Sequence, residues 1–122
     1  MIKSQQKKQM EITEKFYTIL NWYTSRIARF PRHARILIGQ PLQQRLFVTQ
    51  DLLIEAVYNP NREKLLKQSN ICLDQLRYLT RLCVDQKLFS LKQMEYAAKE
   101  LNIIGGMIGN WIKSVRQKMV IP

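Results

Sequence analysis

The chain has 122 residues, 46% of them hydrophobic, and its 20 Lys and Arg residues outnumber 9 Asp and Glu residues to give a net charge of +11. The length suits one domain with its own core, and because the sequence has no apolar run of about 18 residues to span a bilayer and no secretory signal in residues 1–8, we expect a cytoplasmic protein. The positive charge indicates a polyanionic partner, most often nucleic acid, although an anionic membrane surface or an acidic protein satisfies the same electrostatics.

Four amphipathic helices are predicted, at about residues 9–28, 40–58, 61–85 and 90–116. The apolar side chains of the first helix, Ile12 and Phe16 among them, fall along one stripe. This helix is predicted to end at Phe30-Pro31, because proline disfavours helical geometry in the residue before it. Short loops between helices of similar length predict an all-α fold, an up-down-up-down antiparallel four-helix bundle formed by a single domain of residues 1–122.

The second helix is apolar around most of its circumference between residues 42 and 58. These apolar side chains cannot share the one stripe that a bundle covers, and a helix that is apolar all round is buried all round. We therefore expect a homo-oligomer with Phe47, Leu53 and Val57 in the interface, together with Trp22 of the first helix. Pro41 is tolerable only in the first turn, so the helix must kink there if it begins earlier.

Capping residues mark the starts of the third and fourth helices. Asn61 is a good N-cap for the third, and Ser90 with Gln93 forms a capping box for the fourth. Cys72 and Cys83 lie on one face of the third helix but roughly 16 Å apart along its axis, beyond the reach of a disulfide. They are predicted to be reduced thiols in the core.

Glycines in the fourth helix predict close helix packing. Gly105 and Gly109 are one turn apart, a spacing that lets a neighbouring backbone approach. The alternative is that Gly105-Gly106 forms a phosphate-cradling loop. The sequence disfavours this alternative, because no strand precedes the glycines and no Lys-Ser/Thr follows at the required spacing.

The motif Leu76-Arg77-Tyr78-Leu79-Thr80-Arg81-Leu82 makes the outer face of the third helix cationic. Its leucines fall toward the core at helical spacing, so Arg77 and Arg81 are predicted to point outward one turn apart. These two arginines are the first candidates for binding nucleic acid or a protein partner. The alternative is a solvated face on which Asp74 and Asp85 pair with them for about 0.3–0.5 kcal/mol each.

A second cationic cluster covers the end of the first helix and the loop after it. Trp22 lies on the flank that carries the first arginines of this cluster, with Lys15 below, which is typical of a platform for single-stranded nucleic acid. The alternative is that Trp22 packs against another subunit while the arginines are hydrated. The cluster consists of Arg26, Arg29, Arg32 and Arg35.

The residue inventory argues against catalysis. His33 is the only histidine, so a metal site with three or four ligands cannot be assembled. A Ser/His/Asp or Cys/His set would need His33 or the two thiols expected in the core. We therefore expect no metal, no cofactor, no small-molecule substrate and no enzyme activity.

Several segments together carry a family pattern: Phe30-Pro31-Arg32, Arg35, Leu37-Ile38-Gly39-Gln40, residues 76–82, Tyr96 and residues 101–111. They resemble the accessory variability determinant (Avd) protein of diversity-generating retroelements, over about residues 12–116. The related four-helix proteins encoded in intervening sequences of 23S ribosomal RNA genes share the start of the second helix but end it with an Asn-Ile-Ala-Glu-Gly-type segment. Here that end reads Val57-Tyr58-Asn59-Pro60-Asn61, which favours the Avd branch. Pro41 departs from the polar or basic residue expected in the family.

The resemblance implies a pentameric ring of four-helix bundles that is basic on its outside and has no catalytic activity. It further implies that the ring binds the reverse transcriptase of the retroelement together with RNA and DNA, and is required for mutagenic cDNA synthesis. The motif arginines carry over as Arg77 and Arg81. The alternative function is a basic oligomeric scaffold of the intervening-sequence type, which docks on an acidic protein or RNA.

Overall fold

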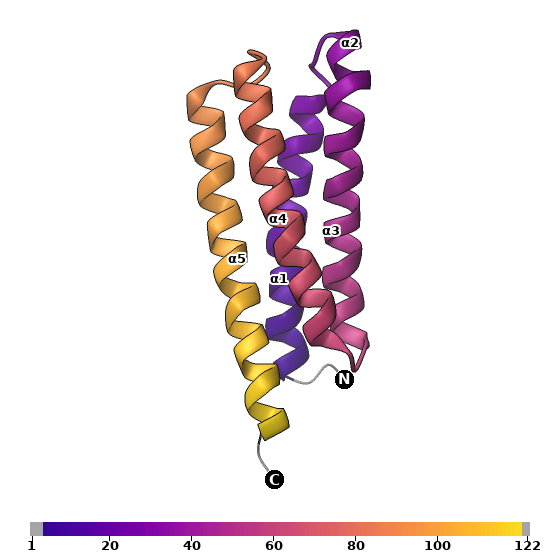
Figure 1. The fold of residues 1–122 in the computed structure, drawn as a ribbon, viewed down its shortest axis with the longest axis vertical. Helices are drawn as coiled ribbons and strands as arrows, with labels where there is room; N and C mark the ends of the chain where they lie inside the picture. Colours follow the sequence, from indigo (N-terminus) through magenta and orange to yellow (C-terminus); the bar gives the residue numbers. More distant parts are fainter. Residues whose placement is uncertain (1–3, 121–122) are drawn as a thin grey trace.

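The structure is a computed structural model that describes residues 4–120. Its elements are α1 (Ser4–Ile27), the short α2 (Arg32–Ala34), the π-helical turn η1 (Arg35–Gly39), α3 (Gln40–Tyr58), α4 (Arg62–Asp85) and α5 (Leu91–Val120) (Figure 1). Across these described residues there is no strand. The predicted all-α class and its four long helices are confirmed.

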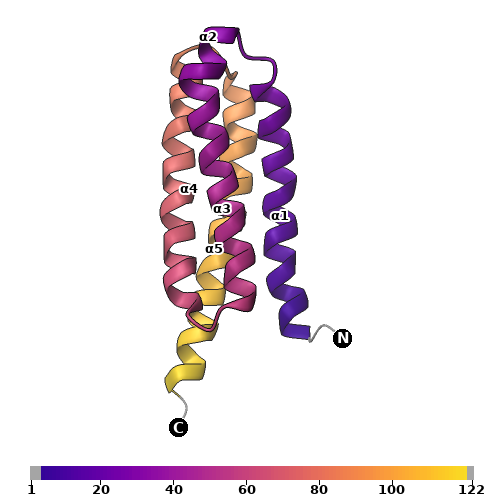
Figure 2. The ribbon, with the colours of Figure 1, turned by 90° about the vertical axis from the view of Figure 1, so that its right-hand side faces the viewer.

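The four long helices pack side by side in an antiparallel bundle. In the view of Figure 1, α1 runs upward, α3 downward, α4 upward and α5 downward, and Figure 2 shows the same order after a quarter turn. Each consecutive pair is in contact, and α5 closes the bundle by packing against α1. The upper end therefore carries the segment between α1 and α3 and the α4–α5 loop, whereas the lower end carries the α3–α4 loop, the start of α1 and the end of α5.

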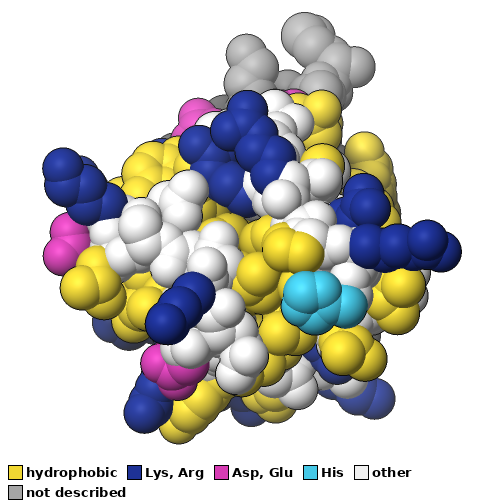
Figure 3. Space-filling model, turned by 90° about the horizontal axis from the view of Figure 1, so that it is seen from above, with side chains coloured by type: hydrophobic (Ala, Val, Ile, Leu, Met, Phe, Trp, Pro, Cys, Tyr) yellow, Lys and Arg dark blue, Asp and Glu magenta, His cyan; other side chains and the backbone are white. Residues whose placement is uncertain are grey.

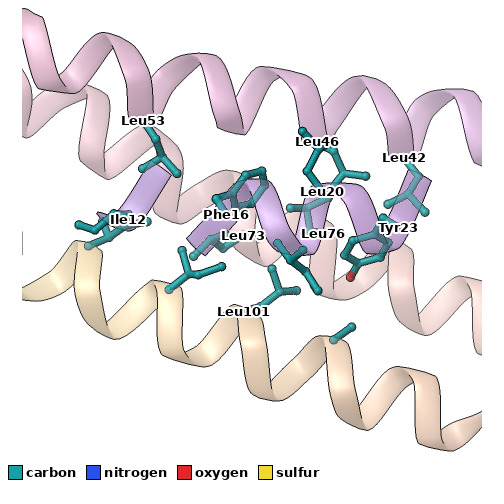
Figure 4. Close-up of a cluster of buried hydrophobic side chains, with 14 of the residues drawn as sticks. Ile12, Phe16, Leu20, Tyr23, Leu42, Leu46, Leu53, Leu73, Leu76 and Leu101 are labelled. Carbon is teal, nitrogen blue, oxygen red and sulfur yellow. The ribbon is translucent and has the colours of Figure 1, made fainter. Parts of the chain in front are cut away.

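The core runs along the bundle axis between the four helices (Figure 4). Its hydrophobic side chains enclose a hydrogen-bonded pair, Tyr23 and Thr80, whose hydroxyl oxygens are 2.6 Å apart. Thr80 Oγ1 donates to the carbonyl of Leu76 at 2.7 Å, so Tyr23 is the donor to Thr80. Burial raises the pKa of Tyr23, and the bond satisfies a hydroxyl that would otherwise be buried without a partner. The side chains without any exposed surface include Phe16, Leu42, Leu46, Leu53, Leu73, Leu76 and Leu101.

Two residues predicted to lie in an oligomer interface belong to this core. Leu53 is 0% exposed and Val57 is 3% exposed, so both pack inside the chain's own bundle and are not available to a second subunit. That prediction is wrong, because counting apolar residues around α3 does not show which of them the other three helices cover. Phe47 keeps 49% of its surface exposed. Ile54, two turns further along the same face of α3, keeps 44%.

The second long helix begins at Gln40, as predicted, but other helical turns lead into it, and a π turn accommodates its proline. The chain is already helical at α2, and η1 leads directly into α3. The backbone N–H of Gln40 donates to the carbonyl of Arg35, five residues back, which shifts the hydrogen-bond pattern immediately before Pro41, whose nitrogen has no hydrogen to donate. At Gly39 a Cβ would lie 2.9 Å from Ile27 Cγ2, so only glycine fits there without displacing α1.

The predicted caps and glycine contacts were partly correct. The capping box is confirmed, since the Ser90 N–H donates to Gln93 Oε1 and the Gln93 N–H donates to Ser90 Oγ. Asn61 occupies the N-cap of α4 as predicted, but its side chain makes no capping bond, and its N–H donates to Asn59 Oδ1. Gly109 has open space around it and contacts no neighbouring backbone.

Both cysteines are buried free thiols, as predicted. Among the described residues, no helix combines the length and the hydropathy that crossing a membrane requires.

Candidate nucleic-acid and partner interface

Cationic side chains gather at the upper end of the bundle. We call this surface the cationic end and define it by residues 28–39 and 85–92. Its charged members are Arg29, Arg32, Arg35, Lys87 and Lys92 against Asp85, and all of them are exposed. Within the described part of the chain, none of these side chains forms a salt bridge. Figure 3 looks down on this end and shows Lys and Arg side chains spread around a surface that also carries hydrophobic groups.

Buried neighbours hold these arginines in place. Phe30 and Ala34 are 5% and 4% exposed, and they alternate with the exposed arginines of the same segment. The ring of Phe30 packs edge-on against Phe89 from the loop between α4 and α5, with their centroids 5.6 Å apart. Residues 28–39 and residues 85–92 therefore pack on each other through buried aromatic rings, and this packing fixes the positions of their charged side chains relative to each other.

Lys87 belongs to the cationic end through an uncommon backbone conformation. Its φ is +60°, in the left-handed region that usually favours glycine. The N–H of Leu88 donates to the carbonyl of Cys83, and the N–H of Lys87 donates to that of Val84, which together form a Schellman motif at the end of α4. Sequence reasoning missed Lys87 and Lys92, although an antiparallel bundle with a capping box at Ser90 places their loop beside the segment that follows α1.

Trp22 is packed within the chain and is not an open stacking platform. Its ring lies 5.0 Å from Tyr23, 5.7 Å from Phe89 and 5.1 Å from Tyr96, measured between centroids. The guanidinium of Arg26 covers the ring at 4.6 Å and donates to the Trp22 carbonyl. Trp22 therefore offers no open ring face for stacking bases, and its predicted place in an oligomer interface stays a prediction.

Lys15 also differs from the predicted platform. Its ammonium is 2.8 Å from the carboxylate of Glu100 on α5. The hydrogen bond and charge of Glu100 raise the pKa of Lys15. The lysine therefore ties α1 to α5 and is not an unpaired cation of a binding platform.

Arg77 and Arg81 turn out to have different environments. Arg77 is an exposed cation only in part: it pairs with Asp74 at 2.7 Å and donates across to Asn102 Oδ1 at 3.1 Å and to the carbonyl of Leu101 at 3.4 Å. The prediction that it points outward holds only in part, because its long side chain reaches α5. Arg81 is exposed and, within residues 9–118, has no ion pair; the alternative pairing with Asp85 is not formed.

An apolar strip runs along the outer groove between α1 and α3. Gln50 Nε2 donates to the carbonyl of Thr13, which sets the register of the two helices. In this antiparallel register Tyr17 lies level with Phe47, and both are about half exposed. Ile54, one turn toward the lower end from Gln50, extends the strip.

A second apolar strip lies on the outward face of α4. Ile71, Tyr78 and Leu82 follow one another at spacings of seven and four residues, so they share one helix face, and all three are exposed. The molecule therefore exposes two different apolar strips, one on each flank of α3.

Metal-ligating and nucleophilic side chains are dispersed in the described part of the chain. The described residues contain no cluster of three or more His, Cys, Asp or Glu side chains that could hold a metal ion. Burial raises the pKa of the Cys83 thiol to about 11, which keeps it protonated and unreactive at neutral pH. His33 stands exposed at the cationic end, apart from both cysteines, which are buried in the core.

Comparison with known proteins gives one finding. A family model described as bAvd-like matches residues 10–115 of the chain. Neither a curated protein nor a solved structure matches it. The matched stretch includes α1 from its first buried side chains, the whole of α3 and α4, and most of α5.

Proposed function

Because the chain belongs to the bAvd-like family, we propose that it is an accessory protein of a diversity-generating retroelement and has no catalytic activity of its own. In this role it binds the reverse transcriptase and nucleic acid, both RNA and DNA, and supports mutagenic cDNA synthesis in the cytoplasm. The interaction is electrostatic, since the chain carries a net charge of +11 and no base-reading motif.

The observation that carries this proposal is the cationic end. Arg29, Arg32 and Arg35 are exposed, rest on buried neighbours and have no carboxylate partner in the described structure. Cations that stabilise a fold are usually paired or pack their stems against it, so a fixed group of unpaired ones favours an external anion. Phosphate groups of a nucleic acid supply such anions at regular spacing.

We also propose that the chain assembles into a ring, a pentamer by family resemblance. The two apolar strips support this assembly, because a cyclic ring needs two different surfaces that fit each other, one on each side of every subunit. Phe47 and Ile54 belong to one strip, and Ile71 and Tyr78 belong to the other. Light scattering at micromolar concentration tests this point: a folded monomer would contradict it.

The competing function is a helical scaffold that docks on an acidic protein without nucleic acid. Protein purified at low salt and then treated with nuclease separates the two functions. A nucleic-acid binder this basic co-purifies with material absorbing at 260 nm that nuclease or 1 M salt removes. Absence of that material, together with retained binding to an acidic protein, would favour the scaffold.

Arg81 supplies the test of the protein contact. Arg81→Glu changes an exposed side chain, so its folding free energy should stay within about 0.5 kcal/mol of the parent. We expect capture of the reverse transcriptase of the same retroelement to fall, because each copy in the ring loses one cation and gains one anion. Unchanged capture would remove Arg81 from the partner surface.

A further inference from the structure

A groove of about 610 Å³ opens at the lower end of the bundle, far from the cationic end. It lies between the start of α1, the start of α4 and the second half of α5. Its walls combine polar side chains with apolar ones, which include Ile12, Met107, Trp111 and Val115. The proposed function uses none of this surface.

Within the part of the chain that the structure describes, two side chains that line the groove each carry a buried polar atom with no hydrogen-bond partner. These atoms are the carboxamide oxygen Oε1 of Gln9 and the indole nitrogen Nε1 of Trp111. Both residues are more than nine-tenths buried, with exposed fractions of 8% and 7%. Buried polar groups in folded proteins are almost always paired, because an unpaired one lowers the folding free energy. An unpaired acceptor and an unpaired donor in the lining of one groove therefore favour binding of a ligand that pairs with both.

The chemistry of the two atoms specifies the ligand. Gln9 Oε1 can only accept a hydrogen bond and Trp111 Nε1 can only donate one, so the complementary group carries one donor and one acceptor. An amide has both, on the nitrogen and the oxygen bonded to its carbonyl carbon, and apolar side chains beside it would fill the apolar part of the walls. The rim carries Arg62 and Lys118 against Glu11, which favours a neutral or acidic segment.

We propose that this groove binds an apolar peptide segment of a partner protein, and that one amide group of the segment pairs with Gln9 and Trp111. A nucleobase also presents a donor beside an acceptor. The groove suits it less, because phosphates would follow the base, and Arg62 already donates to the carbonyls of Ala56 and Val57. This proposal stands independently of the nucleic-acid function, since it concerns the opposite end of the bundle.

The test uses the full chain labelled with ¹⁵N and N-acetyl-L-leucinamide as the probe, the smallest apolar peptide with amides on both sides. The chain has two tryptophans, so the spectrum holds two indole N–H signals, which Trp22→Phe assigns. We expect the Trp111 signal to move saturably with a dissociation constant of roughly 1–10 mM, as suits a ligand of this size. The Trp22 signal, from the upper half of the bundle, should stay in place.

Matched variants separate binding through the proposed hydrogen bonds from nonspecific hydrophobic binding. Gln9→Met keeps the length of the side chain and removes the acceptor, so we expect affinity to fall about fivefold with no loss of thermal stability, because the lost acceptor was unpaired. Gln50→Met is the control: Gln50 Oε1 is also buried and unpartnered but lies outside the groove, so this variant should bind as the parent does. Ser114→Phe fills the groove from an exposed position and should abolish the shift.

Several results would overturn the proposal. One is an unmoved Trp111 signal, and another is equal binding by the parent and Gln9→Met. A Trp111 shift that uridine produces at lower concentration than the peptide would assign the groove to nucleobases. A signal that changes with protein concentration alone would assign it to a second copy of this chain, and an upfield move of the free Trp111 signal in Gln9→Met would show that the two side chains already bond each other.

Discussion

The two ends of the bundle carry similar cations in different settings. At the lower end, Arg62 donates to the carbonyls of Ala56 and Val57, and Arg116 pairs with Glu63. At the cationic end, Arg29, Arg32 and Arg35 have no such partners in the described structure. The net charge is therefore a poor guide to function by itself. Arginines of the lower end stabilise the connection between helices, whereas those of the cationic end are available to a partner.

The largest expected effect on stability separates the two ends directly. Arg62→Ala leaves the last carbonyls of α3 without a charged donor and should cost about 1–2 kcal/mol of folding free energy. Arg32→Ala should cost no more than about 0.5 kcal/mol. Chemical denaturation of both variants provides the measurement. Equal losses would show that the cationic end is also structural.

Arg77 and Arg81 repeat the comparison within one helix. Arg77→Ala breaks the pair with Asp74 and the bond to Asn102, so it should cost about 1 kcal/mol. Arg81→Ala, one turn away, should change the folding free energy by less than about 0.5 kcal/mol. Urea midpoints at equal protein concentration check both values. If Arg77→Ala leaves the folding free energy unchanged, the contacts of Arg77 do not stabilise the fold, and its charge is available to a partner.

Lys87 offers a smaller and opposite effect. Lys87→Gly relieves the left-handed backbone at the Schellman motif and should stabilise the fold by about 0.5–1 kcal/mol. If nucleic acid contacts this lysine, the same variant binds it more weakly. Thermal unfolding and a binding titration on one sample measure both effects. A destabilised variant would mean that the lysine side chain is needed for packing at this loop.

The smallest effect is a pH dependence at the lower end. Arg116 lowers the pKa of Glu63 below its ordinary value of 4.5. A carboxylate with a lowered pKa stabilises the fold above its ordinary pKa, and this contribution is lost as the pH falls through the lowered value. The parent and Glu63→Gln should therefore differ most near neutral pH and converge as the pH falls below 4.5. A constant difference across that range would contradict the ion pair.

The sequence was informative about local structure and much less so about contacts between helices. The capping box at Ser90 was predicted correctly because both of its partners lie within one turn. Leu53 was assigned wrongly and Arg77 only in part correctly, since their environments depend on helices far away in the sequence. Pro41 marked a real irregularity, but its resolution by a π turn that begins at Arg35 depends on tertiary packing against α1.

The residues of the candidate site also divide into those that the sequence predicts and those that only the fold brings together. Arg29, Arg32 and Arg35 were found because they are neighbours in the sequence. Lys87 and Lys92 join them only through the antiparallel topology. Trp22 and the arginines near it have the sequence pattern of a stacking platform. The ring of Trp22, however, packs against side chains from α1, α5 and the loop between α4 and α5.

The most direct test of the account compares two triple variants of equal charge. Arg29→Glu/Arg32→Glu/Arg35→Glu reverses the cationic end, and Lys64→Glu/Lys67→Glu/Lys113→Glu reverses three exposed lysines toward the lower end. Fluorescence anisotropy with labelled single-stranded RNA at several salt concentrations measures binding by each. With about five phosphate contacts, the parent should show a slope near −3.5 for log affinity against log salt. We predict that the first variant loses at least about two of these contacts while the second keeps the slope of the parent, and equal losses in both variants would contradict the account.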